Sequence, residues 1–440
     1  AARGHEIILS DLEFIYKGLT KGHFQPGVFH TKSLTPSKTK IKRHNSLVNH
    51  GSIITSIDEE SGIHLKGYKK FLRERYSRKT IDQSSAVFTW GDEDYKSLNK
   101  KYKRFSKKIY KTGSPRADLC RPYFIKYWKI QKKIINKPYI LIPSNLSIFG
   151  YQSFIKTVYT LKELDYYDRV PNILNAQLTS SSNNYLKAKV LIEAIKYLAQ
   201  NNKGYKIVFR PHPLERVDIW RFMLRGIPNV YVENSGPINN WIHNSFAVIH
   251  HGCTTAVETC LSQKPLITYV PNELKSHHLQ NEFSNELGFK IKSKNELLKK
   301  INFLFEKNKN KYFKTNSHKL SSKISKKIFI DKHELASEKI VKIWEKITLN
   351  KNFIPTNLKT LKFFFLKMKI NQIIGNILKK LSPLKYGHLG SSNVNYKFQN
   401  LDFNEINSRV EKLQKILKIE KNLECKLISK RAILIRQAKI

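Results

Sequence analysis

The chain has 440 residues, of which 40% are hydrophobic and 11% aromatic, which suits two globular domains and excludes a disordered chain. Its 80 Lys and Arg residues exceed its 34 Asp and Glu residues and give a formal net charge of +46. We attribute this charge to drift in composition together with a role at an anionic membrane surface. No nucleic-acid-binding signature accompanies the charge, so nucleic acid is not an expected partner.

The first residues, Ala1 to His5 followed by the apolar Ile7–Leu9, look like a helix end, a glycine stop and then a strand. There is no initiator Met, and we infer that an upstream strand and helix are missing and that the chain is a fragment. The sequence shows no signal peptide and no apolar run of about 20 residues. The four scattered cysteines form no CxxC pair, which favours a reducing compartment. We expect a cytoplasmic protein that lies peripherally at the inner face of the plasma membrane.

Residues 1–135 form the first predicted domain, an α/β unit. A helix is expected at Asp11–Leu19, and apolar runs that end in polar loops occur at Ile7–Leu9, Ser52–Ile57 and Ala86–Trp90. The repeated order of apolar run and polar loop predicts a sheet with functional loops along one edge.

Residues 136–347 form the second predicted domain, which begins with a linker at 136–138 and a strand at Tyr139–Ile142. Further strand candidates are Ile207–Phe209, Val230–Val232, Phe246–Ile249 and Leu266–Val270. Helical segments are expected at Asn184–Gln200, Leu214–Arg225, Pro237–Asn244, Thr255–Ser262, Glu296–Glu306 and His333–Ile347, with an exposed loop or frayed helix at Lys307–Lys327. Strands that alternate with helices predict a parallel sheet, and such sheets bind ligands outside the carboxyl ends of their strands.

Residues 348–440 form a basic helical extension. The segment from Leu358 to Leu381 mixes lysines with bulky apolar residues, which suits either an amphipathic helix on an anionic membrane or a helix packed on the domains with solvated lysines. Glu405–Ile440 resembles a charged helix with apolar periodicity.

Two motifs follow neighbouring strand candidates in the second domain. In the first, Arg210-Pro211-His212-Pro213, each proline restricts the backbone, so the loop is stiff and holds an imidazole at the sheet edge. There His212 can donate to a phosphate oxygen and stabilise a leaving nucleotide, while Arg210 adds charge and Pro213 shapes the site. The alternative is a rigid turn whose histidine only caps a neighbouring strand.

The second motif is the stretch from His250 to Glu258. Gly252 permits a tight turn, and Thr254 and Thr255 begin a helix whose N–H groups and hydroxyls suit a phosphate. Thr255 and Glu258 also fit a capping box, which needs no ligand. Glu258 is alternatively a ligand of ribose hydroxyls.

Three adjacent acids, Asp58, Glu59 and Glu60, end a strand candidate of the first domain. Adjacent carboxylates raise one another's pKa, which suits a general base for an acceptor hydroxyl. The alternative is an exposed acidic turn. No metal is expected, because His250 and His251 lack a carboxylate at ligand spacing, and no cofactor is expected, because the glycines match neither GxGxxG nor a P-loop.

The order of these motifs resembles the bacterial surface carbohydrate biosynthesis proteins. The resemblance rests on Arg-Pro-His-Pro at 210–213, His-Gly-Cys-Thr-Thr-Ala-Val-Glu at 251–258 and Lys-Pro-Leu-Ile-Thr-Tyr at 264–269, with N-terminal blocks at 57–60, 90–91 and 112–118. It covers roughly residues 1–345 and weakens beyond. It implies a GT-B-like α/β architecture, in which two Rossmann-like domains with parallel sheets face a cleft. Wider relatives, the polysialyltransferases and Kdo transferases, bind CMP-sugars through His-Pro and Ser/Thr motifs, which here would be His212, Pro213, Thr254 and Thr255.

The resulting hypothesis is a metal-independent glycosyltransferase for capsule, lipopolysaccharide or another surface glycan. Its partners would be a nucleotide-sugar donor, with a CMP-sugar favoured, and a glycan or lipid-linked acceptor. A CDP-polyol phosphotransferase and a UDP-sugar 2-epimerase share this scaffold and remain alternatives. A non-catalytic protein that binds a polyanion is the alternative from another class.

Overall fold

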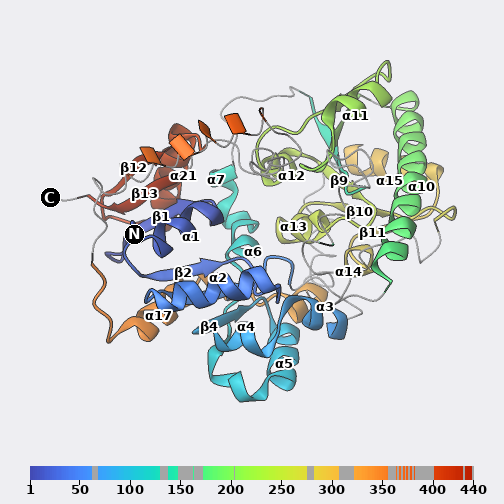
Figure 1. The fold of residues 1–440 in the computed structure, drawn as a ribbon. Coiled ribbons are helices and arrows are strands. Elements are labelled where there is room, and N and C mark those ends of the chain that lie inside the picture. The colour runs from blue at the N-terminus through green and yellow to red at the C-terminus, as the bar shows by residue number, and fades with distance from the viewer. Residues whose placement is uncertain are drawn as a thin grey trace. The chain divides into compact units, whose positions relative to one another are not determined.

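The computed structural model describes most of the chain as helices, strands and connecting loops (Figure 1). The described residues are 1–61, 68–128, 137–146, 162, 172–202, 204–274, 282–306, 322–354, separate positions between 363 and 381, 401–429 and 432–438. Most of the predicted segments at 307–327 and 358–381, and the start of the predicted linker, therefore lie outside the described residues. The chain divides into two compact units, residues 1–30, 39–55 and 344–440 in one and residues 31–38 and 56–343 in the other. The predicted domain limits, which follow a different division, remain a prediction.

The larger unit contains a fully parallel six-stranded sheet of order β11-β10-β9-β6-β7-β8. Its strands are β6 (Tyr139–Pro143), β7 (Lys206–Arg210), β8 (Val230–Val232), β9 (Ala247–His250), β10 (Leu266–Tyr269) and β11 (Phe289–Ile291). In chain order this is the 3-2-1-4-5-6 arrangement of a Rossmann fold. The predicted α/β class with parallel sheets is confirmed.

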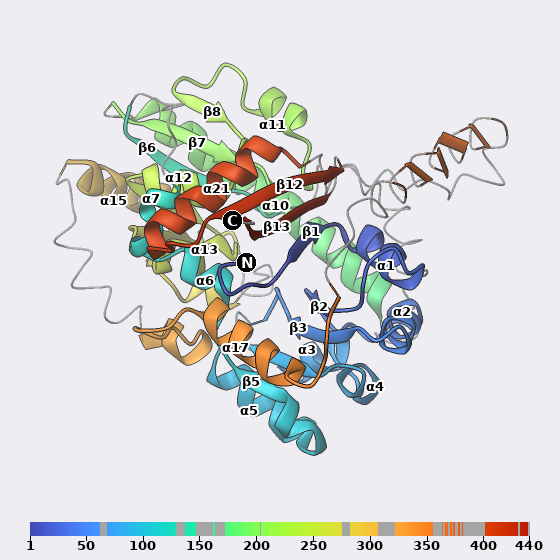
Figure 2. The same ribbon diagram turned by 90° about the vertical axis from the view of Figure 1, so that its left-hand side faces the viewer.

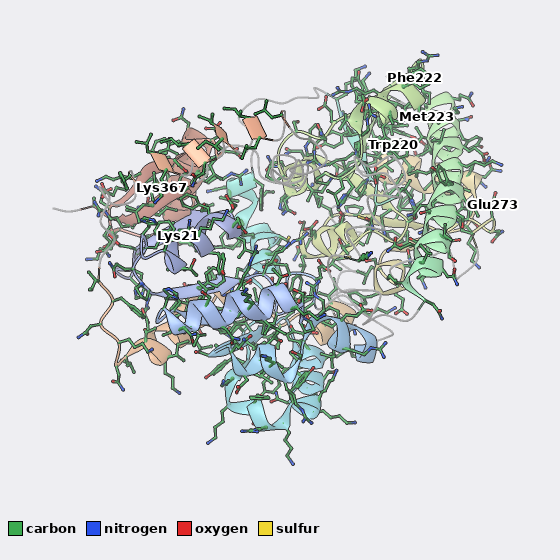
Figure 3. All side chains as sticks on the ribbon, in the orientation of Figure 1. Lys21, Trp220, Phe222, Met223, Glu273 and Lys367 are labelled. Carbon is green, nitrogen blue, oxygen red and sulfur yellow. The ribbon has the colours of Figure 1, made fainter. Side chains whose placement is uncertain are left out.

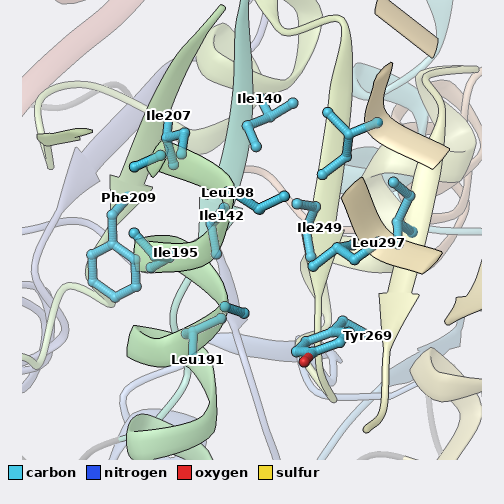
Figure 4. Close-up of a cluster of buried hydrophobic side chains, with 14 of the residues drawn as sticks. Ile140, Ile142, Leu191, Ile195, Leu198, Ile207, Phe209, Ile249, Tyr269 and Leu297 are labelled. Atoms are coloured by element: carbon cyan, nitrogen blue, oxygen red, sulfur yellow. The ribbon is translucent and has the colours of Figure 1, made fainter. Parts of the chain in front are cut away.

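One face of this sheet carries the main hydrophobic core. Alternate strand residues such as Ile140, Phe209 and Ile249 point into it, because successive side chains of a strand face opposite sides. The helices that supply the other side of the core are α10 (Ile173–Gln200), α11 (Val217–Met223) and α15 (Lys294–Glu306). Figure 4 shows this cluster between the strands and α10. Helix α10 begins eleven residues before the predicted start at Asn184, because its polar first half carries no apolar periodicity that the sequence pattern can detect.

Short helices occupy the remaining connections of the sheet. They are α12 (Ile238–Asn244), α13 (Thr255–Leu261) and α14 (Glu282–Asn285), and α12 and α13 contact strands β6, β9 and β10. On α11, Trp220 is fully buried, whereas Phe222 is 59% exposed on the surface (Figure 3). The helices expected at Leu214–Arg225, Pro237–Asn244 and Thr255–Ser262 are confirmed within a few residues at each end.

A second sheet has four strands in the order β2-β3-β4-β5, and β4 and β5 pair in parallel. Its strands are β2 (Val28–Thr31), β3 (Ile53–Ile57), β4 (Ala86–Thr89) and β5 (Ile109–Lys111). The helical elements that accompany it in sequence are α2 (Lys38–Asn49), α3 (Tyr68–Arg75), α4 (Arg78–Asp82), α5 (Asp92–Lys101), η1 (Lys103–Lys108), α6 (Pro115–Leu119), η2 (Pro122–Phe124) and α7 (Ile125–Trp128). The strands predicted at 52–57 and 86–90 are confirmed.

The third sheet is antiparallel and has the order β1-β13-β12 (Figure 2). It joins β1 (Ile7–Ser10), which α1 (Leu12–Thr20) follows, to β12 (Leu423–Ser429) and β13 (Ala432–Gln437) near the other end of the chain. The prediction of one helix over 405–440 is wrong beyond α21 (Phe403–Leu417). Lys418 takes a positive φ of 52° and ends the helix, and a β-hairpin follows because β1 offers its apolar core a partner.

Helix α17 (Ala336–Thr348) confirms the helix predicted at 333–347. The Asp118 carboxylate anchors its first turn, since Oδ2 accepts a hydrogen bond from the Ala336 N–H at 2.6 Å. Gly113 lies nearby with a φ of 82°, and a Cβ there would meet the Phe329 carbonyl oxygen at 2.4 Å. The polar block at 112–118 therefore includes residues that hold structure.

Candidate functional site

The candidate site lies at the carboxyl edge of the six-stranded sheet, where the strand order reverses between β6 and β9. Connections from these adjacent strands run in opposite directions, which leaves a crevice that binds ligands in this class of fold. The loops after β6, β7 and β9 carry Ser144, His212 and Gly252. Both predicted nucleotide motifs therefore follow strands of this one edge.

A buried carboxylate ties two of these loops together. Glu215 is 1% exposed, and its Oε1 accepts a hydrogen bond from the Leu146 N–H at 2.8 Å. Its Oε2 accepts from the Trp220 Nε1–H at 2.8 Å, and the Ser144 hydroxyl lies 3.0 and 2.8 Å from the two oxygens. The β6 loop is further joined to β7 by the Ser144 N–H, which donates to the Arg210 carbonyl at 2.8 Å. Glu215 thus holds the two loops in one arrangement.

His212 lies half-buried in the loop that Glu215 anchors. Its Nδ1 accepts a hydrogen bond from the Leu214 N–H at 3.2 Å, and its carbonyl accepts from the Glu215 N–H at 2.8 Å. In the neutral ring this arrangement puts the proton on Nε2. The hydrogen bonds of the loop therefore set both the position and the tautomer of the imidazole.

Arg210 is turned towards the loop that follows β8. Its guanidinium donates to the Ser235 carbonyl at 2.9 Å and to the Gly236 carbonyl, and it lies 5.8 Å from the Trp241 ring centroid. In this arrangement Arg210 shapes the neighbouring loop. Its predicted contact with phosphate remains a prediction.

The loop after β9 turns at Gly252, whose φ is 81°. Helix α13 follows, and its N-cap residue is Thr254. The Thr254 side chain makes no capping hydrogen bond. The proposed capping box of Thr255 and Glu258 is not formed, because Thr255 already lies inside the helix and the Glu258 carboxylate binds elsewhere. The Thr255 hydroxyl instead accepts a hydrogen bond from the Cys253 thiol at 3.1 Å.

Acidic side chains gather around this loop. Burial raises the pKa of the Cys253 thiol, and the charges of Glu258 and Glu215 raise it further, while hydrogen bonds to Thr255 oppose the change. Cys253 therefore lies within electrostatic reach of a carboxylate from the β7 loop and another from α13. The three loops converge on one region.

Glu258 is held by a cation on a helix that follows the last strand of the four-stranded sheet. Its side chain is 8% exposed, and Oε1 accepts hydrogen bonds from Arg116 Nη2 at 2.6 Å and Nε at 3.0 Å. Arg116 belongs to α6 and is half exposed. In addition, the Ser262 hydroxyl donates to the Cys120 carbonyl at 2.9 Å, so that α6 and α13 are joined at two points.

The three acids after β3 differ sharply in their surroundings. Asp58 is buried and binds Arg75 through both oxygens, at 2.8 and 3.0 Å. Burial raises the pKa of Asp58, and the bonds to Arg75 oppose that change. The Glu60 side chain is 66% exposed and lies 3.2 Å from the same arginine. Asp58 therefore anchors α3, and Glu60 faces solvent.

Glu59 is partly buried, and several charges act on its carboxyl. Burial raises the pKa of its carboxyl, the charge of Arg116 lowers it, and Asp58 raises it again. The pKa of Arg116 is raised, chiefly by the charge of the Glu258 carboxylate and also by that of Glu59. Arg116 thus couples Glu59, which follows β3, to Glu258 on α13.

His250 and His251 are both buried. His250 Nε2 lies 2.9 Å from the Thr268 hydroxyl on β10. Burial lowers the pKa of His250 to about 3 and that of His251 to about 4, so both rings are neutral at pH 7. Among the described residues, no group of three or more His, Cys, Asp or Glu side chains has a geometry suited to a metal ion.

Sequence reasoning did not single out Glu215, Arg75 or the link between Arg116 and Glu258. Glu215 stands two residues after the Pro213 of a recognised motif and faces a strand loop from 69 residues earlier in the chain. The sequence around Glu215 gives no indication that its carboxylate binds a loop 69 residues away in the chain. The only available signal was its place immediately after the rigid loop.

No protein-family model matches the sequence, and no curated protein matches it. Among solved structures, a putative UDP-N-acetylglucosamine 2-epimerase from Listeria monocytogenes is similar over 77% of this chain and 79% of its own, with 11% identity and a TM-score of 0.44. The UDP-GlcNAc 2-epimerase from Methanocaldococcus jannaschii, in complex with UDP-GlcNAc and UDP, is similar over 76% and 78% of the two chains, with 15% identity and a TM-score of 0.43. The wall teichoic acid polymerase TagF is similar over 73% of each chain, with 13% identity and a TM-score of 0.42. At these values the similarities assign neither a family nor an activity.

Proposed function

We propose that the chain is a glycosyltransferase that uses a nucleotide-sugar, with a CMP-sugar favoured, to build a bacterial surface polysaccharide. The observation that supports this best is Arg116, which couples an acid with a raised pKa, Glu59, to Glu258 beside the β9 loop. The proposed proton acceptor, Glu59, and the predicted nucleotide ligand, Glu258, therefore both interact with the charge of Arg116. An acid of this kind in the loop after β3 favours an enzyme over a protein that only binds polyanions.

The proposed reaction begins with the donor at the carboxyl edge of the six-stranded sheet. Glu258 exchanges Arg116 for the ribose hydroxyls, and the His212 Nε2–H donates to a phosphate oxygen. Thr254 and Thr255, beside Gly252, contribute hydroxyls and backbone N–H groups to the same phosphate, and Pro213 keeps the loop rigid. The bond between the anomeric carbon and the phosphate oxygen breaks, and the nucleotide leaves as an anion that His212 stabilises.

Glu59 takes the proton of the acceptor hydroxyl, and that oxygen forms the new bond to the anomeric carbon. A general base at this step typically accelerates a reaction by about 10²–10⁴-fold. Of the three predicted acids, Glu59 suits this role because Asp58 is bound to Arg75 and Glu60 is exposed.

Calorimetric titration with CMP, CDP and UDP, repeated on His212→Ala, tests the donor site. Selective binding of CMP that the substitution abolishes would support the proposal. Selective binding of CDP would favour a CDP-polyol phosphotransferase, and selective binding of UDP a UDP-sugar 2-epimerase. A folded protein that binds no nucleotide would favour the non-catalytic alternative.

Glu59→Gln tests the proposed base, with Glu60→Gln as its matched control. We expect Glu59→Gln to retain nucleotide binding but to lower kcat by at least about 100-fold. Glu60→Gln should change kcat by less than about threefold, because its side chain is largely exposed. Equal losses in the two variants would show that Glu59 has no special role.

We also infer peripheral contact with an anionic membrane. No helix among the described residues is both long enough and apolar enough to cross a membrane. However, the described positions between 363 and 381 include seven exposed apolar side chains at helical spacing, namely Phe363, Leu366, Ile370, Ile373, Ile374, Ile377 and Leu381. The same segment contains lysines and no Asp or Glu. An apolar stripe with basic neighbours suits anionic headgroups and the acyl chains beneath them.

Sedimentation with vesicles of neutral or anionic phospholipid tests this contact. We expect binding to anionic vesicles, and a loss of at least about tenfold in Ile373→Asp/Ile377→Asp, since each apolar side chain contributes roughly 1.5–3 kcal/mol when it is buried. Equal binding of neutral and anionic vesicles, or no effect of the double substitution, would contradict the inference.

A further inference from the structure

Lys187 is an unusual residue of helix α10. It is only 2% exposed, yet no described residue supplies a carboxylate or a hydrogen-bond acceptor to its ammonium group. Burial lowers its pKa to about 8, and no neighbouring acid opposes that change. An ammonium group in a largely buried side chain is costly when no carboxylate among the described residues compensates its charge.

The position of Lys187 on the helix directs it to the candidate site. Leu191, Ile195 and Leu198 belong to the core face of α10, and Figure 4 shows them following one another along the sheet towards the level of Phe209 and Tyr269, near the carboxyl ends of β7 and β10. Lys187 precedes Leu191 by four residues, so it lies on the same face about one turn, or 5.4 Å, further along. The apolar face of α10 thus becomes cationic near the carboxyl edge of the sheet.

His251 reaches the same place from the sheet. Ala247 and Ile249 of β9 point into the core that α10 covers, and alternation puts His251 on that side directly after the strand. The charge of Lys187 is accordingly one of the causes, after burial, that lower the pKa of His251. His251 Nδ1 is buried and has no hydrogen-bond partner among the described atoms.

We propose that Lys187 and His251 form a buried anion subsite beside the β9 loop, and that its ligand is the phosphate of the donor nucleotide. The identity of this ligand rests on the proposed function, whereas the subsite rests on the geometry of α10 and β9. A phosphate oxygen would accept from Nζ of Lys187 and supply the negative charge that no described residue supplies. Lys187 would then provide the phosphate contact that Arg210, turned towards Ser235 and Gly236, does not make in this arrangement.

Lys187→Met tests the proposal, because methionine is similar in length and carries no charge. Lys189→Met is the matched control, since Lys189 lies on the same helix and is exposed. The probes are inorganic pyrophosphate, CMP and CDP, titrated calorimetrically. We expect Lys187→Met to weaken binding of each phosphate-containing ligand that the unchanged protein binds by about 10- to 100-fold, and Lys189→Met to bind as the unchanged protein does.

A denaturation curve without ligand separates an anion subsite from a structural role. Removal of an unpaired buried charge should leave the unfolding midpoint unchanged or raise it. A Lys187→Met protein that loses stability together with affinity would overturn the proposal, because Lys187 would then be paired within the fold. Unchanged affinity in Lys187→Met would overturn it as well.

Failure of the proposed function has a different signature. If the unchanged protein binds pyrophosphate but no nucleotide, and Lys187→Met loses pyrophosphate, the anion subsite stands and the nucleotide-sugar proposal fails. If nucleotides bind equally to both proteins, the function stands and the subsite fails. If neither pyrophosphate nor any nucleotide binds, both are refuted.

Discussion

The hydrogen-bond network of Glu215 leads to a graded prediction about stability. Three donors converge on this buried carboxylate, namely the Ser144 hydroxyl, the Leu146 N–H and the Trp220 Nε1–H. Glu215→Ala leaves all three without their acceptor, and each unpaired buried donor costs about 1–3 kcal/mol. Allowing for water that enters the space, we expect the free energy of unfolding to fall by about 3–5 kcal/mol.

Glu215→Gln should fall between the unchanged protein and Glu215→Ala. The Leu146 and Trp220 donors contact different oxygens, so a glutamine can accept from only one of them and turns its NH₂ towards the other. One unpaired donor predicts a loss of about 1–3 kcal/mol. Ser144→Ala removes a donor and leaves the carboxylate its other partners, which predicts a loss of about 1 kcal/mol.

Equilibrium unfolding in urea, followed by tryptophan fluorescence, measures these differences, and the buried Trp220 is itself a reporter. Because Glu215 holds the loops after β6 and β7, nucleotide affinity should fall in the same order as stability. A Glu215→Ala protein within 1 kcal/mol of the unchanged protein, or a glutamine variant as unstable as the alanine variant, would refute this reasoning.

Three further predictions concern other parts of the larger unit. Arg116→Met leaves the largely buried Glu258 carboxylate without its cation. The free energy of unfolding in urea should fall by about 1 kcal/mol. An unchanged free energy of unfolding would show that water solvates Glu258 adequately. His250 and His251 are neutral in the folded protein, because burial lowers the pKa of both rings, and each gains a proton near pH 6.5 in the unfolded chain. The free energy of unfolding should therefore fall as the pH drops from 6.5 towards 4. At pH 4.5 we expect a loss of about 2–3 kcal/mol per ring. His251→Asn should reduce this pH dependence, and an unchanged profile would contradict the neutral state. Gly288→Ala should destabilise the protein by about 1–3 kcal/mol. The φ of Gly288 is 78°, and a new Cβ there would lie 2.6 Å from a carbonyl oxygen of β10. An unchanged unfolding midpoint would show that the backbone there relaxes.

Much of the six-stranded parallel sheet was predictable because its signals are local. The apolar runs at 207–209, 230–232 and 246–249 are short and lie between helical segments, and all of them become strands of the parallel sheet. The predicted helix over 405–440 failed after Leu417 because strand and helix periodicities are hard to separate in short apolar segments. The partner strand β1, which decides the outcome, lies more than 400 residues away in the chain.

The sequence by itself determined the alternation of strands and helices, the rigid loop around His212, and the presence of acids after β3. Spacing and backbone preference between near neighbours are sufficient for those features. Only the tertiary structure distinguished Glu59 from Asp58 and Glu60, paired Glu258 with Arg116, and buried Lys187 one turn beyond the apolar face of α10. These outcomes depend on which distant groups share a desolvated space, because burial and opposing charge set the cost of each ionised state. The sequence does contain one indication of the buried lysine, since Lys187 precedes Leu191 and Ile195 at the helical spacing of the core-facing side of α10.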